Sequence, residues 1–287
     1  MYVYLNGKIV PIQEATVSVL DHGFLYGAGL FETMRTVGGR PMFWQEHMTR
    51  LRESADELGI SIPWSDDELE KGVVDTVQAN GLQEAYIRLT VTRGEGALGP
   101  SGKSCTTPTL VIYVKELILP PSHVYEQGRD LIVLQTVRST PETPVRVKSL
   151  NYLNSLLAYR ELELRGAAEG IQLTKEGYVA EGAVSNLFFV VDGELWTPSL
   201  ETGILSGVTR AWVINQVREM GVNIRERRFT LDELVGLEEA FSSSSIVGII
   251  HAKSISAVNF QKKGIGIVSR TLQGKWKKLT NSRGRSI

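Results

Sequence analysis

Segments typical of β-strands follow one another without an intervening helix in the second half of this chain. The stretches "EGIQLT", "GYVAEG", "SNLFFVV" and "GELWTP" succeed each other between residues 169 and 198. A doubly wound parallel sheet needs a helix after each strand, and the chain contains neither a GxGxxG nor a phosphate-loop motif. The pattern therefore predicts an α+β fold and argues against a Rossmann-type sheet.

A candidate linker divides the chain in two. The stretches "EAYIRLTVTRG" and "TPTLVIYVKEL" before it are rich in branched residues and predict strands. Two prolines in "LILPPSHVYEQG" then end the extended pattern, and the strand-like "DLIVLQTVR" follows. We therefore expect a smaller domain over residues 1–118, a linker over 119–126 and a larger domain over 127–287.

Composition places the chain among soluble globular proteins. Its 287 residues are 42% hydrophobic and 22% charged, and no apolar run is long enough to span a bilayer. The first residues lack the basic and apolar regions of a signal peptide. Cys105 is the only cysteine, which excludes an internal disulfide and a cysteine metal cluster. We expect a cytoplasmic protein without a metal site.

The C-terminal segment is basic. After Glu239 the last 48 residues contain nine Lys or Arg and no acidic residue. Such a tail is compatible with nucleic-acid binding, but aromatic residues do not interleave the charges. The stretch "IVSRTLQGKWKKL" instead places Ile267, Leu272, Trp276 and Leu279 at roughly helical spacing. We expect a solvated amphipathic helix and no nucleic-acid partner.

A lysine stands at the start of "KSLNYLNSLLAYRE". Lys148 precedes a predicted helix whose leucines 153, 156, 157 and 164 have apolar spacing and should face the core. A lone lysine is usually solvated at the surface. A lysine held at low dielectric instead loses its charge more easily and becomes a nucleophile.

Three further features bear on that choice. Glu181 in "VAEGAVSNLF" is either an exposed acid or a partner for a protonated ring nitrogen. Val208 and Thr209 open a predicted helix whose N–H groups could bind phosphate, although Ser206 could be an ordinary N-cap. Arg50 lies on the buried side of its helix and needs an anion, either a phosphate or an internal carboxylate. Together with a reactive lysine, these features describe a pyridoxal phosphate site.

The chain resembles the fold-type IV pyridoxal-phosphate enzymes, which include branched-chain aminotransferases, D-amino-acid aminotransferases and 4-amino-4-deoxychorismate lyases. The resemblance runs through "YLNG", "DHGFLYGAGLFETMR", "EHMTRL", "VKSLNYLNSLLAYRE", "GYVAEGAVSNLFFV" and "TPSLETGILSGVTR", and it weakens after Phe241. It implies a two-domain α+β fold with the cofactor between the domains, and a homodimer.

The resemblance also implies a role for each matching residue. Lys148 would be the Schiff-base lysine and proton shuttle, and Glu181 would keep the pyridine nitrogen protonated. Tyr152, one helical turn past Lys148, would donate a hydrogen bond to the phenolic oxygen of the cofactor. The phosphate ligands would be Arg50, Val208, Thr209 and Ser245. A non-catalytic binder that kept the fold is the remaining alternative, and retention of this full set argues against it.

The stretch "FETMR" bears on the reaction. Branched-chain aminotransferases typically carry Phe-Glu-Gly-Ile-Arg there, whereas the Thr33 hydroxyl resembles lyases and could assist a departing oxygen. Tyr26, Arg35 and Arg88 would bind substrate. D-amino-acid enzymes usually have Tyr in place of Phe31 and an Arg-x-His motif that this chain lacks. We expect the lyase, which forms p-aminobenzoate and pyruvate, ahead of branched-chain transamination with 2-oxoglutarate and D-amino-acid transamination.

Overall fold

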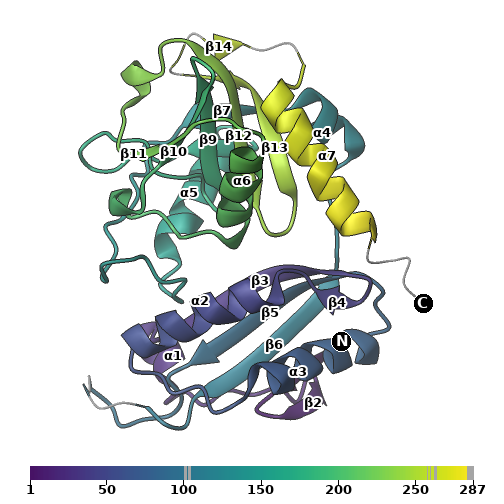
Figure 1. The fold of residues 1–287 in the computed structure, drawn as a ribbon. Helices are drawn as coiled ribbons and strands as arrows, with labels where there is room; N and C mark the ends of the chain where they lie inside the picture. The colour runs from purple at the N-terminus through teal and green to yellow at the C-terminus, as the bar shows by residue number, and fades with distance from the viewer. Residues whose placement is uncertain (100–101, 103–104, 257, 259, 262–263, 283–287) are drawn as a thin grey trace. The chain divides into compact units, whose positions relative to one another are not determined.

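The computed structural model describes residues 1–99, 102, 105–256, 258, 260, 261 and 264–282. Contacts divide the chain into two compact units (Figure 1). Among the described residues, unit 1 comprises Met1–Ile118 and Val147–Asn151, and unit 2 comprises Leu119–Arg146 and Tyr152–Ser282. Residues 283–287, the end of the predicted basic segment, lie outside the described part of the chain.

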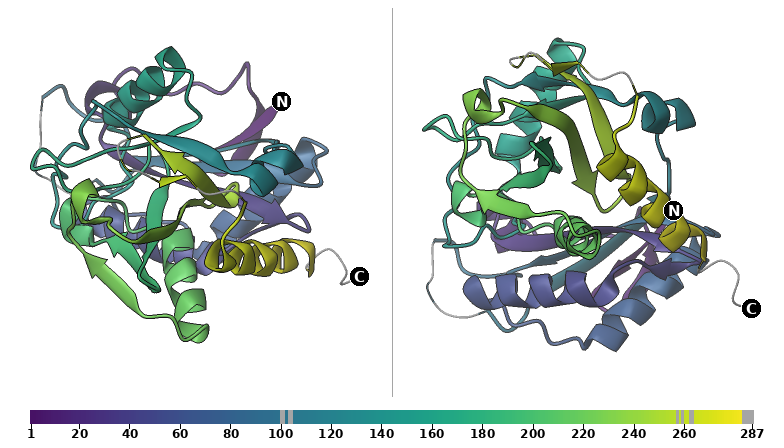
Figure 2. Two further views of the ribbon diagram at one scale, coloured as in Figure 1. Left: turned by 90° about the horizontal axis from the view of Figure 1, so that it is seen from above. Right: turned by 45° about the horizontal axis from the view of Figure 1, so that its top comes forward.

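Unit 1 contains an antiparallel six-stranded sheet in the order β2-β1-β6-β5-β3-β4. Its strands are β1 (Tyr2–Leu5), β2 (Lys8–Pro11), β3 (Gly29–Val37), β4 (Arg40–Pro41), β5 (Ala85–Thr92) and β6 (Thr109–Glu116). Its helices are α1 (His22–Tyr26), α2 (Trp44–Glu57) and α3 (Asp66–Ala79). Helices α2 and α3 cover one face of the sheet, as Figure 2 shows.

The two-residue period of β3 determines how this unit packs. Met34 faces the core with Ile87 of β5, and Met48 and Leu51 of α2 pack into the same cluster. The intervening side chains of β3, which include Thr33, point to the opposite face of the sheet. One face of β3 therefore holds the core while the other can carry chemistry.

Lys148 belongs to unit 1 by its contacts. The Phe31 N–H donates to the Lys148 carbonyl at 3.0 Å, and the Leu150 N–H donates to the Gly29 carbonyl at 2.9 Å. The segment around Lys148 therefore adds to the β3 edge of the first sheet. The prediction that the larger C-terminal domain carries this lysine is wrong, because backbone pairing with β3 decides its place rather than its position in the chain.

Unit 2 is built on a mixed sheet in the order β11-β10-β9-β12-β13-β7-β8, with β14 paired to β13. Its strands are β7 (Arg129–Val133), β8 (Glu169–Ile171), β9 (Asn186–Val191), β10 (Glu194–Pro198), β11 (Ile224–Arg227), β12 (Leu237–Ser244), β13 (Gly248–Ile255) and β14 (Phe260–Gln261). Its α-helices are α4 (Ser122–Gln127), α5 (Leu153–Leu164), α6 (Val208–Glu219) and α7 (Ile267–Ser282), with short 3₁₀ turns at Leu200–Thr202 and Leu231–Glu233.

Strand β9 separates two cores of unit 2. Phe188 and Val190 pack with residues of α6 and α7. Phe189 and Val191 point the other way and pack with Phe229. A strand buried on both faces reads as a continuous apolar run, which explains the sequence "NLFFVV".

Helix α5 corrects one expectation. Its buried residues are Ser155, Ala158 and Leu162. The four leucines predicted to face the core are 44–78% exposed; they are Leu153, Leu156, Leu157 and Leu164. Apolar spacing identifies a helical face, but here the small side chains on another face allow the close approach of the protein.

Three smaller differences concern the strands, the linker and the last helix. "GYVAEG" is irregular apart from a bridge between Leu173 and Val179, and its Val179 N–H donates to the Phe229 carbonyl. The predicted linker contains helix α4 after its prolines. In α7, Ile267 is 80% exposed and Val268 is buried in its place. Among the described residues, no helix combines the length and apolar character required to cross a membrane.

Candidate active site

Lys148 lies beside an aromatic ring in unit 1. Its Nζ is 4.5 Å from the centroid of the Phe31 ring, and the Cζ atom of Arg88 is 3.7 Å from the same centroid. Phe31 is buried, while Lys148 and Arg88 are half-buried. Cations at these distances from a ring are attracted by its negative face. The solvated-lysine alternative does not fit this setting.

Thr33 shares this face of β3. It lies directly opposite Arg88 in the β3–β5 register, and its side chain is half-buried. Among the described residues, the structure gives the Thr33 hydroxyl no hydrogen-bond partner. The structure therefore brings together the predicted lysine, Arg88 and Thr33 around Phe31.

The other two predicted substrate residues have partners of their own. Arg35 is buried, and its Nε donates to the Thr36 carbonyl at 3.4 Å. The Tyr26 hydroxyl accepts a hydrogen bond from the Gly99 N–H at 2.8 Å, and its ring meets His22 edge to face. Tyr26 is 43% exposed. The roles of Tyr26 and Arg35 in substrate binding stay predictions.

Tyr152 is not one helical turn past Lys148, as predicted. It is the residue before helix α5, which begins at Leu153, and Lys148 lies in extended chain paired with β3. Five residues of non-helical chain in this region place the two side chains by loop geometry rather than by helical periodicity.

Arg50 binds an internal carboxylate. Its Nε donates to Glu32 Oε1 at 2.8 Å and its Nη2 donates to Glu32 Oε2 at 2.5 Å. Burial raises the pKa of Glu32, but the charge of Arg50 and hydrogen bonds from His47 and Arg50 lower it to about 2. Of the two anions that the sequence left open for Arg50, the structure shows the carboxylate; the phosphate role stays a prediction.

In unit 2, Glu181 is held by three donors. Arg138 Nε donates to Oε1 at 2.7 Å, while Asn186 Nδ2 and the Leu205 N–H donate to Oε2 at 3.2 and 3.1 Å. Glu181 is only 5% exposed, so the exposed-acid alternative is wrong. A carboxylate has about four lone-pair sites, which leaves one for a further donor.

The start of α6 forms a second group of donors in unit 2. Gly207 is the N-cap, no side chain caps the helix, and its first N–H groups have no acceptor within the helix. The Thr209 and Ser245 hydroxyl oxygens are 3.1 Å apart. A Cβ atom on Gly207 would come within 2.0 Å of Asn186 Oδ1, so this close approach requires glycine.

Comparison with known proteins places the chain in a family. Residues 29–255 match the family described as Amino-transferase class IV. The chain belongs to this family. It is similar to a putative branched-chain-amino-acid aminotransferase of Methanocaldococcus jannaschii, with 38% identity over 100% of this chain and 99% of the relative. It is also similar to the aminodeoxychorismate lyase of Bacillus subtilis, with 34% identity over 96% of this chain and 94% of the relative.

A solved class IV aminotransferase shares the fold. The structure of a branched-chain amino acid aminotransferase from T.th. with pyridoxamine 5'-phosphate has a TM-score of 0.89 at 30% identity, covering 98% of this chain and 94% of that one. The predictions of a fold-type IV α+β structure, of a pyridoxal-phosphate-dependent enzyme and of pyridoxal 5'-phosphate as its cofactor are confirmed.

The donors of this class IV aminotransferase suit that cofactor. Unit 1 supplies the Lys148 amine on the same side of β3 as an apolar ring. Unit 2 supplies the uncapped helix start beside the Thr209 and Ser245 hydroxyls, which suits a phosphate. It also supplies Glu181, whose remaining acceptor site suits a protonated ring nitrogen.

Sequence reasoning missed the partners of these groups. Arg138 and Asn186 orient Glu181, and neither belongs to a motif that would have identified it. Glu32 was identifiable, because the alternation of β3 turns its side chain toward the helix that carries Arg50. A buried arginine facing a buried carboxylate is the pairing that the sequence could have predicted.

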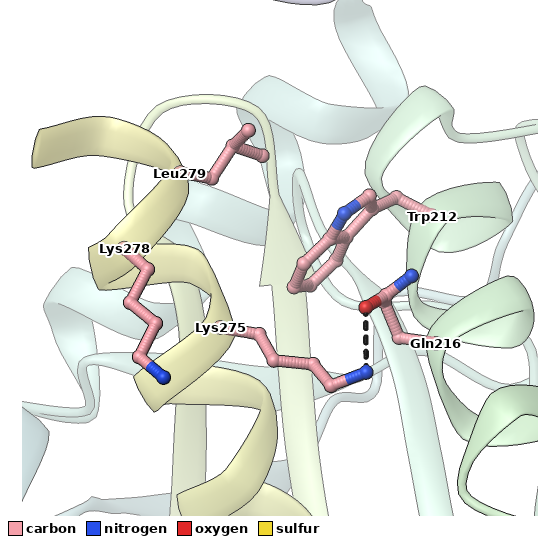
Figure 3. Close-up of a pocket in the computed structure, with 5 residues that line it drawn as sticks. All are labelled: Trp212, Gln216, Lys275, Lys278 and Leu279. Atoms are coloured by element: carbon pink, nitrogen blue, oxygen red, sulfur yellow. Dashed lines mark hydrogen bonds between the residues drawn. The ribbon is translucent and has the colours of Figure 1, made fainter. Parts of the chain in front are cut away.

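A pocket in unit 2 lies apart from these residues in sequence and content. It lies between α6 and α7 and is lined by Trp212, Gln216, Lys275, Lys278 and Leu279, as Figure 3 shows. Lys275 Nζ donates to Gln216 Oε1 at 2.8 Å within it. None of the predicted site residues lines this pocket.

Proposed function

We propose that this chain is a branched-chain amino acid aminotransferase that uses 2-oxoglutarate as the amino acceptor. The observation that carries the proposal is the row formed by Lys148, Phe31 and Arg88 in unit 1. A reactive amine and a carboxylate-binding cation share one apolar ring there. This combination suits an enzyme that accepts an apolar amino acid and a dicarboxylic keto acid in turn. The whole-length similarity to a putative branched-chain aminotransferase supports the same proposal.

The chain's residues would share the work as follows. Pyridoxal 5'-phosphate supplies a ring that withdraws electrons from the substrate carbon next to the amino group. The Lys148 amine would take the proton from that carbon and return it later. The Glu181 carboxylate would hold a proton at the pyridine nitrogen, with Arg138 and Asn186 fixing its direction. Arg88 would bind a substrate carboxylate.

The remaining proposed roles concern binding. Arg50, the Val208 and Thr209 N–H groups, and the Thr209 and Ser245 hydroxyls would hold the phosphate. Tyr152 would donate to the phenolic oxygen. These roles follow from the family resemblance, and the uncapped start of α6 beside two hydroxyls supports them in unit 2.

One observation favours aminodeoxychorismate lyase as a second candidate. The Thr33 hydroxyl has no partner among the described residues and lies on the β3 face that carries Phe31. A hydroxyl there could donate a hydrogen bond to the oxygen that leaves with pyruvate. The similarity to the Bacillus subtilis lyase accords with this reading, at lower identity than the first relative.

The first experiment compares the two reactions on the same purified holoenzyme. We expect glutamate to form from leucine, isoleucine or valine with 2-oxoglutarate at a catalytic rate. Formation of p-aminobenzoate from 4-amino-4-deoxychorismate without transamination would replace the first proposal by the second. The Lys148→Ala variant should lose both activities and the visible absorption of lysine-bound cofactor; a variant that keeps this absorption would contradict the role of Lys148.

Two variants of Thr33 separate its hydroxyl from its size. Thr33→Gly should leave or raise transamination, because it opens space on the Phe31 face, and should depress any lyase turnover. Thr33→Val keeps the branched shape and removes only the hydroxyl. If the hydroxyl acts in elimination, both variants lose lyase turnover alike; lyase turnover that survives in Thr33→Val would show that Thr33 only fills the strand.

We also propose that the enzyme is a homodimer, as the family resemblance implies. Helix α5 supports the proposal because its leucines at 153, 156, 157 and 164 are exposed in the single chain. Large exposed apolar patches mark interaction surfaces more often than solvent-facing ones.

A further inference from the structure

A buried polar network lies between β3 and α2 in unit 1. Arg50 meets Glu32 through two parallel hydrogen bonds, at 2.8 and 2.5 Å. His47 Nδ1 lies 2.6 Å from Glu32 Oε2. Glu32 is 1% exposed and His47 is fully buried. Such a bidentate contact fixes both the position and the plane of a guanidinium group.

The local sequence explains why these groups meet. The alternation of β3 turns Glu32 away from the Phe31 face and toward α2. His47 and Arg50 are three residues apart on α2, so they lie on one side of the helix. All three side chains therefore converge from two rigid elements rather than from a loop.

The charge states in this network follow from its contacts. Glu32 has a pKa of about 2, so it is ionised and can only accept hydrogen bonds. Burial lowers the pKa of His47 despite the adjacent carboxylate, so the ring is neutral at physiological pH. His47 must then carry its proton on Nδ1 and donate it to Glu32. His47 thereby occupies Oε2 from the side that Arg50 does not use.

We propose that Glu32 is a positioning residue that aims Arg50 at the phosphate of the cofactor, and that His47 locks Glu32 in place. The proposal rests on the proposed function, in which Arg50 binds that phosphate. A guanidinium is planar and carries five N–H donors. Because Glu32 holds two of them along one edge, it fixes the direction of the other three. Orientation of a binding group by a buried partner is a recognised source of affinity.

The opposite expectation is equally definite. If Glu32 only neutralised Arg50, removing its charge would leave a stronger positive field and tighten phosphate binding. The two roles therefore predict changes of opposite sign in the same measurement.

The experiment compares pyridoxal 5'-phosphate with pyridoxal, which lacks the phosphate. Equilibrium dissociation constants are measured on cofactor-free protein in a buffer without phosphate or sulfate. The ratio of the pyridoxal constant to the pyridoxal phosphate constant isolates the contribution of the phosphate. We expect Glu32→Gln to lower this ratio about tenfold, without a matching loss of pyridoxal affinity. An unchanged or higher ratio would overturn the proposal.

A neighbouring arginine on α2 provides the matched control. Arg52 Nε donates to Asp66 at 2.8 Å, two residues along the helix from Arg50. Asp66→Asn removes the carboxylate partner of that arginine and should leave the ratio unchanged. A similar fall in this control would show that the ratio reports general damage to α2, which would count against the proposal.

Variants of His47 keep the test decisive if Glu32→Gln folds poorly. His47→Leu removes the donor to Glu32 and should lower the ratio, while His47→Asn retains an N–H near the Nδ1 position and should restore it. Equal ratios in the two variants would contradict the locking role. Arg50→Lys tests the underlying function separately: a ratio unchanged there removes Arg50 from the phosphate site, whereas a fall there with no fall in Glu32→Gln refutes only the positioning role.

Discussion

Replacing Gly182 by alanine should damage the turn that carries Glu181. A Cβ atom on Gly182 would lie 2.2 Å from Ser185 Oγ and 2.9 Å from Glu169 Oε1. Gly182 does not have a positive φ, so alanine meets no backbone strain. The obstacle is contact alone. Ser185 cannot simply turn away, because its hydroxyl donates to Glu169 Oε2 at 2.8 Å.

The magnitude follows from the bond that must yield. Glu169 and Ser185 are 6% and 8% exposed, so a broken bond leaves a hydroxyl and an acid with little access to water. Losing a buried hydrogen bond to an acidic group costs about 1.5–3 kcal/mol. We therefore expect Gly182→Ala to lower the free energy of unfolding by about 2 kcal/mol and to weaken cofactor binding through displacement of Glu181.

Urea unfolding of the cofactor-free variants measures this cost. Gly274→Ala is the control, because it places a Cβ atom within α7 where no atom lies within 4 Å, and it should stabilise by about 0.5–1 kcal/mol. The double variant Gly182→Ala/Ser185→Ala removes the colliding oxygen. Its cost should be at least about 1 kcal/mol below the sum of the single costs. Additive costs would refute the steric reasoning.

Two other predictions follow from burial. The folded pKa of Glu32, about 2, lies below its ordinary value of 4.5, so its contribution to stability is complete above that value and is lost as the pH falls from about 4.5 toward 2; acid unfolding should show a loss on the order of 3 kcal/mol that is absent in Glu32→Gln. Leu156 on α5 is 58% exposed, so Leu156→Glu should favour the monomer in sedimentation or light scattering without lowering the stability of the isolated chain, and an unchanged association state would remove α5 from the proposed dimer surface.

Periodicity predicted the parts of the site that regular elements position. The alternation of β3 placed Phe31 and Thr33 on one face, and the helical period of α2 placed Arg50 on its buried side. Both expectations agree with the structure because core packing selects the same faces that the apolar pattern indicates. The helix opened by Val208 was predictable for a related reason, since a glycine N-cap precedes an apolar periodic segment.

The rest of the site depends on contacts that no local pattern encodes. Lys148 was assigned to the wrong unit because five residues of chain pair with β3, more than a hundred residues away in sequence. Glu181 was assigned to a strand end, whereas it lies in a turn fixed by Arg138 and by the acid Glu169. The leucines of α5 misled because spacing shows that a helix has an apolar face, but not what that face meets.

The choice of reaction depends on fewer atoms than the cofactor site. The groups that suit the cofactor are a helix start, a turn and a buried arginine, and each is fixed by backbone geometry or by partners within its unit. Such groups serve transamination and elimination equally, which is why both reactions occur among relatives of similar identity. On the β3–β5 face, by contrast, a single hydroxyl at Thr33 stands opposite Arg88. A scaffold that holds the cofactor rigidly leaves selection of the reaction to such side chains, so substitution at Thr33 tests the function more directly than any change in the cofactor site.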